Sequence, residues 1–246
     1  MKRIFDIVVS AVGLLGTSVV LLPTMFLIWR QDGFSPFYIA PRTGMNERPF
    51  RMVKLRSMIK NADKSGVDST SAGDNRITAV GRFVRKYKLD EMTQLWNVLK
   101  GDMSLVGPRP NVKRETDLYT REEKKLLSVR PGITDFASIV FSDEANILDG
   151  KPDPDIAYNQ LIRPGKSRLG LFYVENSSIW VDIQLIWLTA VSSASRSSAL
   201  RGVARILQRM NAPADLVDLA RRDKPLIPAP PPGATQIVTS RDAVAI

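Results

Sequence analysis

The longest apolar stretch of the chain lies near its N-terminus and predicts a membrane helix. Residues 7 to 29 carry no charge, and as a helix they would extend about 34 Å, enough for a bilayer core. No cleavage site of the signal-peptide kind closes this stretch. Positive charges flank it on both sides, with Lys2 and Arg3 before it and Arg30 after it, so the charge pattern does not indicate which end would lie outside the cytosol.

Proline interrupts this apolar stretch at position 23, which favours a bend there because proline lacks a backbone donor. A helix that turns back at Pro23 would be re-entrant, with both of its ends in the cytosol. The carbonyl that the proline leaves unpaired needs a partner, and the expected donors are the hydroxyls of Thr17, Ser18 and Thr24. The alternative is a proline-kinked helix that spans the bilayer.

Shorter elements are expected after the anchor. Residues 35 to 58 combine aromatic and alternating apolar positions around turn residues, which predicts a β-hairpin. Residues 61 to 75 are rich in Ser, Gly, Asp and Asn and predict a mobile loop. A helix bearing Arg82, Phe83 and Tyr87 is expected to follow.

A second amphipathic helix is predicted by the helical spacing of four apolar residues, with glycine as its stop. These residues are Met92, Leu95, Trp96 and Leu99, followed by Gly101. The turn Gly107-Pro108-Arg109-Pro110 cannot be helical, because two prolines restrict the backbone, and it should hold Arg109 on a stiff support.

The second half of the chain predicts a charged surface helix at residues 115 to 128 and a strand or tight turn at residues 129 to 134 that presents Arg130. Residues 178 to 191 have a helical apolar stripe that is too short to span a bilayer, so this helix is either core or lies in the membrane interface. Its apolar positions are 179, 180, 183, 186, 187 and 190.

Near the C-terminus, apolar positions oppose arginines along one further predicted helix. Leu200, Val203, Leu207 and Met210 lie opposite Arg201, Arg205 and Arg209, as in a basic amphipathic helix at a membrane surface. A solvated helix packed on the domain is the alternative. The proline-rich residues that follow predict a disordered tail.

Together these elements predict an α+β protein that is predominantly α-helical, with a membrane helix, in-plane amphipathic helices and a small β-hairpin. Four regions are expected. They are a membrane anchor at 1–30, a core at 31–195, a basic amphipathic helix region at 196–222 and a disordered tail at 223–246.

The net charge of +10, from 35 basic and 25 acidic residues, indicates anionic partners. Nucleic acid, a membrane surface and phosphorylated small molecules all qualify. The chain has no cysteine and no histidine, which excludes thiolate catalysis, imidazole bases and metal sites built from these residues. Any catalysis must therefore depend on carboxylates, Lys, Arg, Tyr, Ser or a hard metal held by oxygen.

The adjacent carboxylates Asp90 and Glu91 are the candidate reaction centre. The bases Arg82, Arg85, Lys86 and Lys88 precede them and Arg109 follows, a grouping suited to phosphoanion chemistry. The competing interpretation needs no chemistry: an aspartate before an apolar-periodic segment is commonly a helix N-cap, and the next glutamate complements the helix dipole.

Several segments resemble, in order and spacing, the bacterial sugar transferase family of monotopic polyprenyl-phosphate phosphoglycosyl transferases. The resemblance covers residues 2 to 191. The segments are Lys2-Arg3-x-x-Asp6, Arg42-x-Gly44, Phe50-x-x-x-Lys54-Leu-Arg-Ser-Met58, Arg76-Ile-Thr78, Gly81-Arg-Phe-Val-Arg85, Leu89-Asp-Glu-Met92, Gly107-Pro-Arg-Pro110 and Arg130-Pro-Gly-Ile-Thr134.

The resemblance implies a re-entrant anchor and a cytosolic catalytic core like that of the family's small members. It implies Asp90 as nucleophile and Glu91, with Asp90 beside it, as the Mg²⁺ ligand. The reaction implied passes a sugar 1-phosphate from a UDP-sugar to polyprenyl phosphate and releases UMP. The residues expected to face the donor are Lys54, Arg85, Pro108, Arg109, Pro110 and Arg130, and those expected at the membrane are Lys2, Arg3 and Pro23.

The resemblance also implies a location at the cytoplasmic face of the bacterial inner membrane, contact with membrane lipids and no nucleic-acid partner. A homodimer is compatible with it. The chain departs from the usual family pattern at three places, where Leu22 precedes the breaking proline, Thr93 replaces a proline, and Asp135 replaces a glycine. The competing class is a membrane-tethered basic binding protein without turnover, and an inactive protein of the same fold is a third possibility.

Overall fold

The structure is a computed structural model that describes residues 1–62 and 74–240. The chain divides into two compact units, unit 1 with Met1–Arg42 and Pro49–Ser104, and unit 2 with Thr43–Arg48 and Leu105–Ile246. Helices predominate in the described residues, and two small two-stranded sheets accompany them, which confirms the α+β, mainly helical prediction. Most of the loop predicted at residues 61 to 75, namely 63 to 73, lies outside the described residues.

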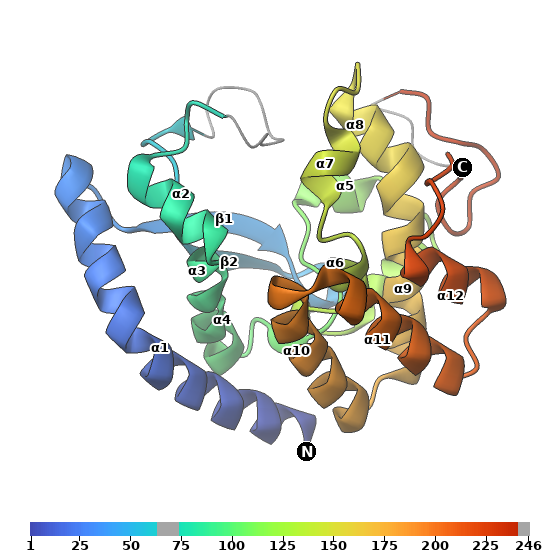
Figure 1. The fold of residues 1–246 in the computed structure, drawn as a ribbon, viewed down its shortest axis with the longest axis horizontal. Coiled ribbons are helices and arrows are strands. Elements are labelled where there is room, and N and C mark those ends of the chain that lie inside the picture. The colour runs from blue at the N-terminus through green and yellow to red at the C-terminus, as the bar shows by residue number, and fades with distance from the viewer. Residues whose placement is uncertain (63–73, 241–246) are drawn as a thin grey trace. The chain divides into compact units, whose positions relative to one another are not determined.

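Unit 1 contains the long N-terminal helix, most of the predicted hairpin and three short helices (Figure 1). The hairpin is confirmed, with its two strands paired and a short 3₁₀ turn, η1, at its tip. The elements are α1 (Lys2–Asp32), β1 (Phe37–Thr43), η1 (Met45–Glu47, in unit 2), β2 (Pro49–Leu55), α2 (Ala79–Lys86), α3 (Leu89–Met92) and α4 (Gln94–Lys100).

Helix α1 continues through Pro23 as one curved helix (Figure 1). It is long and apolar enough to cross a membrane, with a mean hydropathy of 2.2 over its most apolar window, of which 17% is buried. Its apolar side chains point mainly outward, whereas polar side chains are found on the protein side. The buried residues are Asp6, Ser10, Leu21, Thr24 and Ile28.

The hydroxyls near Pro23 bond to carbonyls other than the expected one. Proline at position 23 leaves the carbonyl of Val19 without its usual helical donor. Thr24 donates to the Val20 carbonyl at 2.7 Å, and Thr17 and Ser18 donate one turn earlier, to Gly13 and Leu15. Each hydroxyl reaches back three or four residues along its own helix, so none is directed at Val19.

The first turns of α1 dock on helix α4 through two charged residues. Arg3 donates to the carbonyls of Val98 and Leu99 at 2.5 and 2.9 Å, at the C-terminal end of α4. Asp6 is 2% exposed, and its Oδ2 accepts from the Ser104 hydroxyl at 2.9 Å. The sequence predicts Arg3 at the membrane; within unit 1 it holds the anchor against α4.

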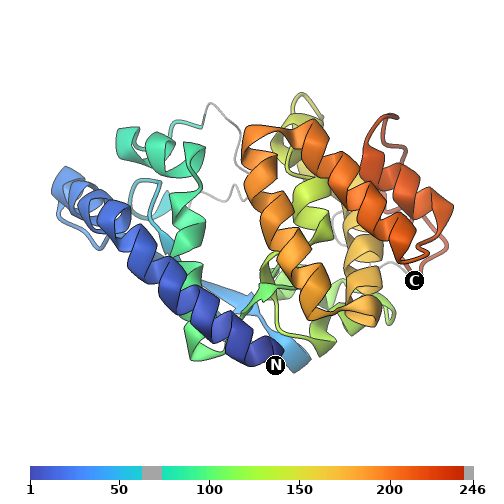
Figure 2. The ribbon, with the colours of Figure 1, turned by 60° about the horizontal axis from the view of Figure 1, so that its bottom comes forward.

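Unit 2 contains mostly short helices, together with a few longer ones towards its C-terminal end. Figure 2 shows α10 and α11 side by side, as in Figure 1. The elements are β3 (Ser104–Val106), whose first residue belongs to unit 1, α5 (Lys113–Asp117), η3 (Glu123–Ser128), β4 (Gly132–Thr134), α6 (Phe136–Val140), α7 (Glu144–Leu148), α8 (Pro154–Ala157), the π-helical turn η4 (Tyr158–Ile162), α9 (Arg163–Asn176), α10 (Ile179–Ala194), α11 (Arg196–Arg209) and α12 (Ala214–Arg221).

The charged surface helix predicted at residues 115 to 128 is wrong as a single helix, because the chain breaks between α5 and η3. Glu123 is the reason: it is fully buried and accepts from the backbone of Thr120 and from the guanidinium of Arg163, at 3.1 and 2.5 Å. Ser167 donates to the same carboxylate at 2.6 Å. A charge that pattern analysis assigns to solvent is instead the centre of a buried ion pair.

The exposure of residues on α10 and α11 decides which face of each helix packs on protein, a question that the sequence left open. On α10 the predicted apolar stripe faces outward, with Trp180 at 73% and Trp187 at 68% exposure, so the core interpretation of this stripe is wrong. On α11 the apolar residues Leu200, Val203 and Leu207 are buried within unit 2 while the arginines are exposed. The apolar face of α11 therefore packs on protein, which corrects its assignment as a membrane-surface helix.

The proline-rich segment expected to be disordered is ordered in its described part. The hydroxyl of Thr120 donates to the Pro232 carbonyl at 2.5 Å, and the side chain of Gln160 donates to the Val238 carbonyl at 2.8 Å. The backbone amide of Ala229 donates to the Gln160 carbonyl at 3.0 Å. Proline-rich chain has little conformational freedom to lose, so a few bonds suffice to fix it.

Candidate active site

Asp90 and Glu91 lie in the first turn of α3, directly after a left-handed residue. Lys88 occupies the cap position with φ 52°, and no side chain caps the helix there. The interpretation of Asp90 as an N-cap is therefore wrong. Both carboxylates are half-buried and lie inside the helix rather than at its cap position.

The electrostatic surroundings of Asp90 are mixed. Burial raises the pKa of the Asp90 carboxyl above its usual value, and the negative charge of Glu91 raises it further, whereas Lys54 and Arg85 lower it. Lys54 comes from β2 and Arg85 from α2, so three separate elements of unit 1 contribute charges around one carboxylate. The sequence prediction that these four residues belong together agrees with this arrangement.

Polar side chains of the helix pair α3 and α4 dock it along strand β2. The hydroxyl of Thr93 lies 3.1 Å from the carbonyls of Val53 and Asp90. Asn97 is fully buried and bonds β2 in both directions, accepting from the Val53 amide at 2.9 Å and donating to the Arg51 carbonyl at 2.7 Å. Strand β2 thereby holds Lys54 in a fixed register beside α3, and Thr93, a departure from the family pattern, takes part in that docking.

Trp96 differs from the helical stripe predicted for this segment. It is 53% exposed, while Leu95 and Val98 are buried together with Gln94 and Asn97. Asn97 is buried because it bonds β2, and the buried positions of the helix are displaced from the predicted stripe. Gly101 ends the helix with φ 94°, as predicted.

Arg85 is held by the turn that follows β2. Its Nε donates to the Ser57 hydroxyl at 2.9 Å. Thr78 donates its backbone amide to the Ser57 carbonyl at 3.1 Å, and Gly81 approaches the same carbonyl so closely that a Cβ at position 81 would lie 1.8 Å from the oxygen. The glycine is therefore required for α2 to lie where Arg85 reaches Ser57.

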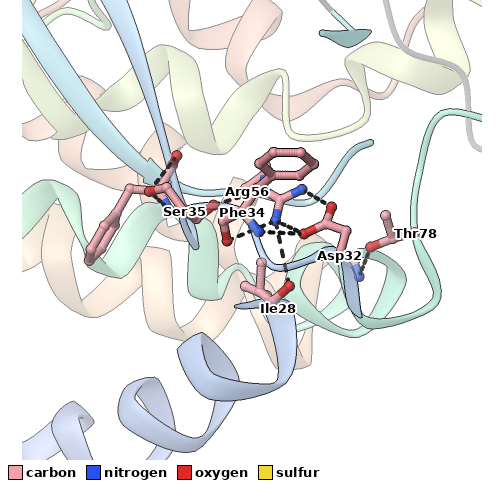
Figure 3. Close-up of polar contacts among 8 residues, drawn as sticks. Ile28, Asp32, Phe34, Ser35, Arg56 and Thr78 are labelled. Atoms are coloured by element: carbon pink, nitrogen blue, oxygen red, sulfur yellow. Dashed lines mark hydrogen bonds and ion pairs between the residues drawn. The ribbon is translucent and has the colours of Figure 1, made fainter. Parts of the chain in front are cut away.

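Arg56 ties the end of α1 to strand β2 (Figure 3). It is 9% exposed, and its guanidinium donates to both carboxylate oxygens of Asp32, at 2.5 and 2.7 Å, and to the Ser35 carbonyl at 2.9 Å. Arg56 directly follows β2, and Lys54 lies two residues earlier within that strand, so this pair fixes the strand relative to the membrane helix. Arg56 is part of the motif from Phe50 to Met58, but nothing in the sequence indicated that it pairs with Asp32.

The remaining candidate residues belong to unit 2. Arg109 and Arg130 are exposed, while Pro108 and Pro110 are buried. Two backbone bonds join their segments, from the Gly132 amide to the Pro108 carbonyl and from the Gly107 amide to the Thr134 carbonyl, both at 3.0 Å. The crossing partners make this pairing antiparallel, which brings the segments of Arg109 and Arg130 together.

Close contact of two glycines makes this pairing possible. A Cβ on Gly132 would lie 2.1 Å from the Gly107 amide nitrogen, and one on Gly107 would lie 2.5 Å from the Arg130 carbonyl oxygen. Any larger residue would separate the segments that carry the two arginines. The glycines of the two motifs thus have a steric explanation.

The donor set around Asp90 suits Mg²⁺. Within the described residues no group of three or more metal-binding acidic side chains is found. Magnesium commonly takes one or two carboxylates and completes its shell with water and substrate phosphates. The two adjacent carboxylates Asp90 and Glu91 fit that number of protein ligands.

The described features define a protein with an apolar membrane-type helix, a half-buried carboxylate pair near basic side chains and a separate pair of arginines. The family model described as bacterial sugar transferase matches residues 1–196. The chain belongs to the bacterial sugar transferase family.

Curated relatives agree with this assignment. The chain is 33% identical over 191 residues to a UDP-N-acetylgalactosamine-undecaprenyl-phosphate N-acetylgalactosaminephosphotransferase of Aeromonas hydrophila, covering 76% of this chain and 42% of the relative. It is 34% identical to the uncharacterized sugar transferase EpsL of Bacillus subtilis, covering 77% and 85%. It is 35% identical to an undecaprenyl-phosphate galactose phosphotransferase of Salmonella typhimurium, covering 81% and 41%. The chain thus spans about two fifths of the length of the first and third of these relatives.

Proposed function

We propose that this protein is a phosphoglycosyl transferase that passes a sugar 1-phosphate from a UDP-sugar to a polyprenyl phosphate. The product would initiate exopolysaccharide, capsule, O-antigen or glycoconjugate assembly. The observation that carries the proposal is the half-buried Asp90, which has Glu91 beside it and Lys54 and Arg85 nearby, in a chain with a membrane-type helix. The activities named for the relatives from Aeromonas and Salmonella support this class of reaction.

The first chemical step belongs to Asp90. One carboxylate oxygen attacks the β-phosphorus of the UDP-sugar, the bond from that phosphorus to the bridging oxygen breaks, and UMP leaves with the electron pair. The result is an acyl phosphate between Asp90 and the sugar 1-phosphate. In the second step an oxygen of the polyprenyl phosphate attacks the same phosphorus, the acyl phosphate bond breaks, and the Asp90 carboxylate is regenerated.

The basic residues bind and orient the phosphates. Lys54 and Arg85 lower the pKa of Asp90 and so favour its ionised, nucleophilic form. Arg109 and Arg130 present guanidinium groups that suit bidentate binding of phosphate oxygens. Glu91 and Asp90 would hold Mg²⁺, which when bound supplies charge neutralisation for the diphosphate.

The apolar outer faces support a location at the membrane. Both α1 and α10 turn large apolar residues outward, as expected for helices that contact lipid. We infer that the protein lies at the cytoplasmic face of the bacterial inner membrane with both termini in the cytosol, and that the curve of α1, rather than a reversal at Pro23, makes this helix re-entrant. The polyprenyl phosphate would reach Asp90 from that surface.

The test is incubation of the purified full chain with UDP-sugars, Mg²⁺ and a polyprenyl phosphate, with UMP release and intact mass as readouts. A sugar phosphate adduct should form before the lipid is added, and Asp90→Asn should lower UMP release by about 10³-fold or more and abolish the adduct. Asp117→Asn, at an exposed carboxylate paired with Lys113, is the matched control. Binding of UDP-sugars without UMP release would identify a membrane-tethered binding protein instead.

A further inference from the structure

Helix α10 buries a carboxylate among apolar residues and exposes two tryptophans. Its buried residues are Val181, Asp182, Leu185 and Leu188, and Asp182 is only 1% exposed. Burying a carboxylate costs free energy unless hydrogen bonds compensate it. The inner face of α10 must therefore supply specific partners, and two of its polar side chains contact the segments that lead to the candidate arginines.

The first contact passes through the neighbouring helix α9. The single hydroxyl proton of Tyr173 is shared between two acceptors, Oδ1 of Asp182 at 2.6 Å and, more weakly, the carbonyl oxygen of Val106 at 3.1 Å. Tyr173 is 1% exposed, so water does not compete for these bonds. Val106 ends β3, and the chain continues from it into the turn that carries Arg109. Asp182 and Tyr173 thus hold the start of that turn.

The second contact lies about two helical turns further along α10, roughly 10 Å away along its axis. The hydroxyls of Thr189 and Thr134 are 2.6 Å apart. Thr189 donates its single hydroxyl proton to the Leu185 carbonyl at 2.8 Å, so Thr134 is the donor between the two threonines. Thr134 ends β4, the strand that follows Arg130.

The two contacts act on opposite strands of one small sheet. The Thr134 carbonyl accepts from the Gly107 amide, so β3 and β4 are bonded to each other as well as being held, each by its own contact, to α10. Arg109 and Arg130 lie on segments that are joined by only a few bonds, and such segments can separate. A helix that holds both strands resists that separation.

We propose that Tyr173 and Thr189 are positioning residues, which fix the segments of Arg109 and Arg130 relative to each other for phosphate binding. This inference rests on the proposed function insofar as the anion is the donor diphosphate. The holding of the two segments is a property of unit 2 that can be measured without substrate. Neither residue touches the reacting groups in this scheme.

Conservative variants test the proposal. Tyr173→Phe removes the hydroxyl and keeps the ring that contacts Phe136 edge to face, with centroids 6.4 Å apart. Thr189→Val removes the acceptor at nearly constant volume, and Thr189→Ser keeps it as the rescue variant. We expect Tyr173→Phe and Thr189→Val to raise KM for the UDP-sugar about fivefold to tenfold with a smaller change in kcat, and Thr189→Ser to restore KM.

Hydrogen exchange gives a readout that is independent of catalysis. The amides of Gly107 and Gly132 are protected by their bonds to Thr134 and Pro108, so peptides covering 105–110 and 130–134 should exchange faster in Tyr173→Phe and Thr189→Val. Gln184→Ala, which removes a side chain bonded within α10 to the Trp180 carbonyl, is the control and should exchange like the wild type.

Unchanged exchange in these peptides would overturn the proposal, and so would a uniform increase across unit 2, because that indicates general destabilisation. If the wild type releases no UMP while the peptides respond as expected, the proposed function fails and the positioning role stands. If the wild type is active and both variants keep its KM and its exchange pattern, the positioning role fails alone.

Discussion

The guanidinium of Arg56 donates from two nitrogens to the carboxylate of Asp32, and this ion pair joins the last turn of α1 to the end of strand β2 (Figure 3). The pair is largely shielded, with side-chain exposures of 9% and 29%. Both partners lie outside the candidate site, yet the strand they fix carries Lys54. The anchor and the candidate site of unit 1 are therefore mechanically linked.

Replacing Arg56 should destabilise unit 1 strongly. Arg56→Met leaves the Asp32 carboxylate and the Ser35 carbonyl without their donor, and loss of hydrogen bonds to a charged group costs about 2 kcal/mol. Thermal unfolding of the detergent-solubilised protein measures the loss as a lower Tm. Arg51→Met, at an exposed arginine of the same strand, should leave Tm nearly unchanged. Equal Tm values for the two variants would contradict the role of the pair.

The same pair predicts an acid-sensitive contribution to stability. Hydrogen bonds from Arg56 hold the pKa of the Asp32 carboxyl below its usual value. A carboxyl with a lowered folded-state pKa stabilises the fold above its unfolded pKa, and that stability is lost as pH falls through the folded pKa. Wild-type Tm should therefore drop more steeply below about pH 4 than that of Asp32→Asn. Parallel Tm curves for the two proteins between pH 6 and 3 would refute this.

The pKa of Asp90 predicts the acid limb of the pH profile. Burial raises this pKa first, and Glu91 raises it further, so the ionised nucleophile becomes depleted at a higher pH than for an ordinary aspartate. The kcat/KM profile should fall as pH drops through this raised value. Glu91→Gln removes a like charge and should shift the limb to lower pH, while Lys54→Met should shift it to higher pH, whatever the absolute rates. Shifts in the reverse directions would contradict the arrangement.

A raised carboxyl pKa also means that ionised Asp90 opposes folding, because the stability of the protein decreases as pH rises through the interval between the unfolded and folded pKa values. Asp90→Asn should therefore be at least as stable as the wild type at pH 7, although it is inactive. Circular dichroism melts compare the two proteins. A much lower Tm for Asp90→Asn would indicate that the carboxylate has a structural role.

Glycine at position 81 should be irreplaceable. In Gly81→Ala the added Cβ would lie 1.8 Å from the Ser57 carbonyl oxygen, so α2 must shift, and we expect a loss on the order of 3 kcal/mol or more. Gly16→Ala, in α1, is the matched control because its Cβ meets nothing within 4 Å, and in a helix alanine gains about 1 kcal/mol over glycine. Comparable melting of Gly81→Ala and Gly16→Ala would contradict the steric argument.

The outward tryptophans of α10 should enter lipid. Trp180 and Trp187 are 73% and 68% exposed, and indole rings favour the interfacial layer of a bilayer. In a variant whose other tryptophans, Trp29 and Trp96, are replaced by phenylalanine, emission should shift to the blue on vesicle reconstitution and be quenched by brominated lipids. A tryptophan at the exposed position 227 of the C-terminal segment, with positions 180 and 187 changed to phenylalanine, should remain unquenched.

Periodicity predicted those elements whose hydrophobic side faces protein. The arginine-faced helix α11 was predicted because its apolar residues are those that unit 2 buries, and the hairpin and the helix of Arg82 were predicted although Phe83 and Tyr87 on that helix are exposed. For α10 the pattern left open whether the stripe faces protein or the membrane interface, and in the structure the stripe points outward while Asp182 is buried. A hydrophobic pattern reports that a helix has two faces, but it does not distinguish protein from lipid.

Buried polar partners could not be predicted because they join residues far apart in the sequence. Glu123 pairs with Arg163 and Asp182 with Tyr173, and Arg56 reaches back 24 positions to Asp32. For Glu123 the local pattern predicted a surface position. The carboxylate pair at 90 and 91 was singled out from basic residues close to it in sequence, of which Arg85 lowers the pKa of Asp90, but Lys54 lowers it too and could not be found in this way; the status of Asp90 as a cap depended on the backbone of Lys88.

The C-terminal segments that pack on unit 2 have a practical consequence for trimming this protein. The family match ends at residue 196, but α11 beyond it buries Leu200, Val203 and Leu207, and Val238 is buried further along. A fragment that ends at the family boundary would expose to water the apolar surfaces of α10 and α6 that α11 covers, and such a fragment would be prone to aggregation. A stable and soluble fragment of this protein should therefore extend some forty residues past the region matched by the family, to about residue 240.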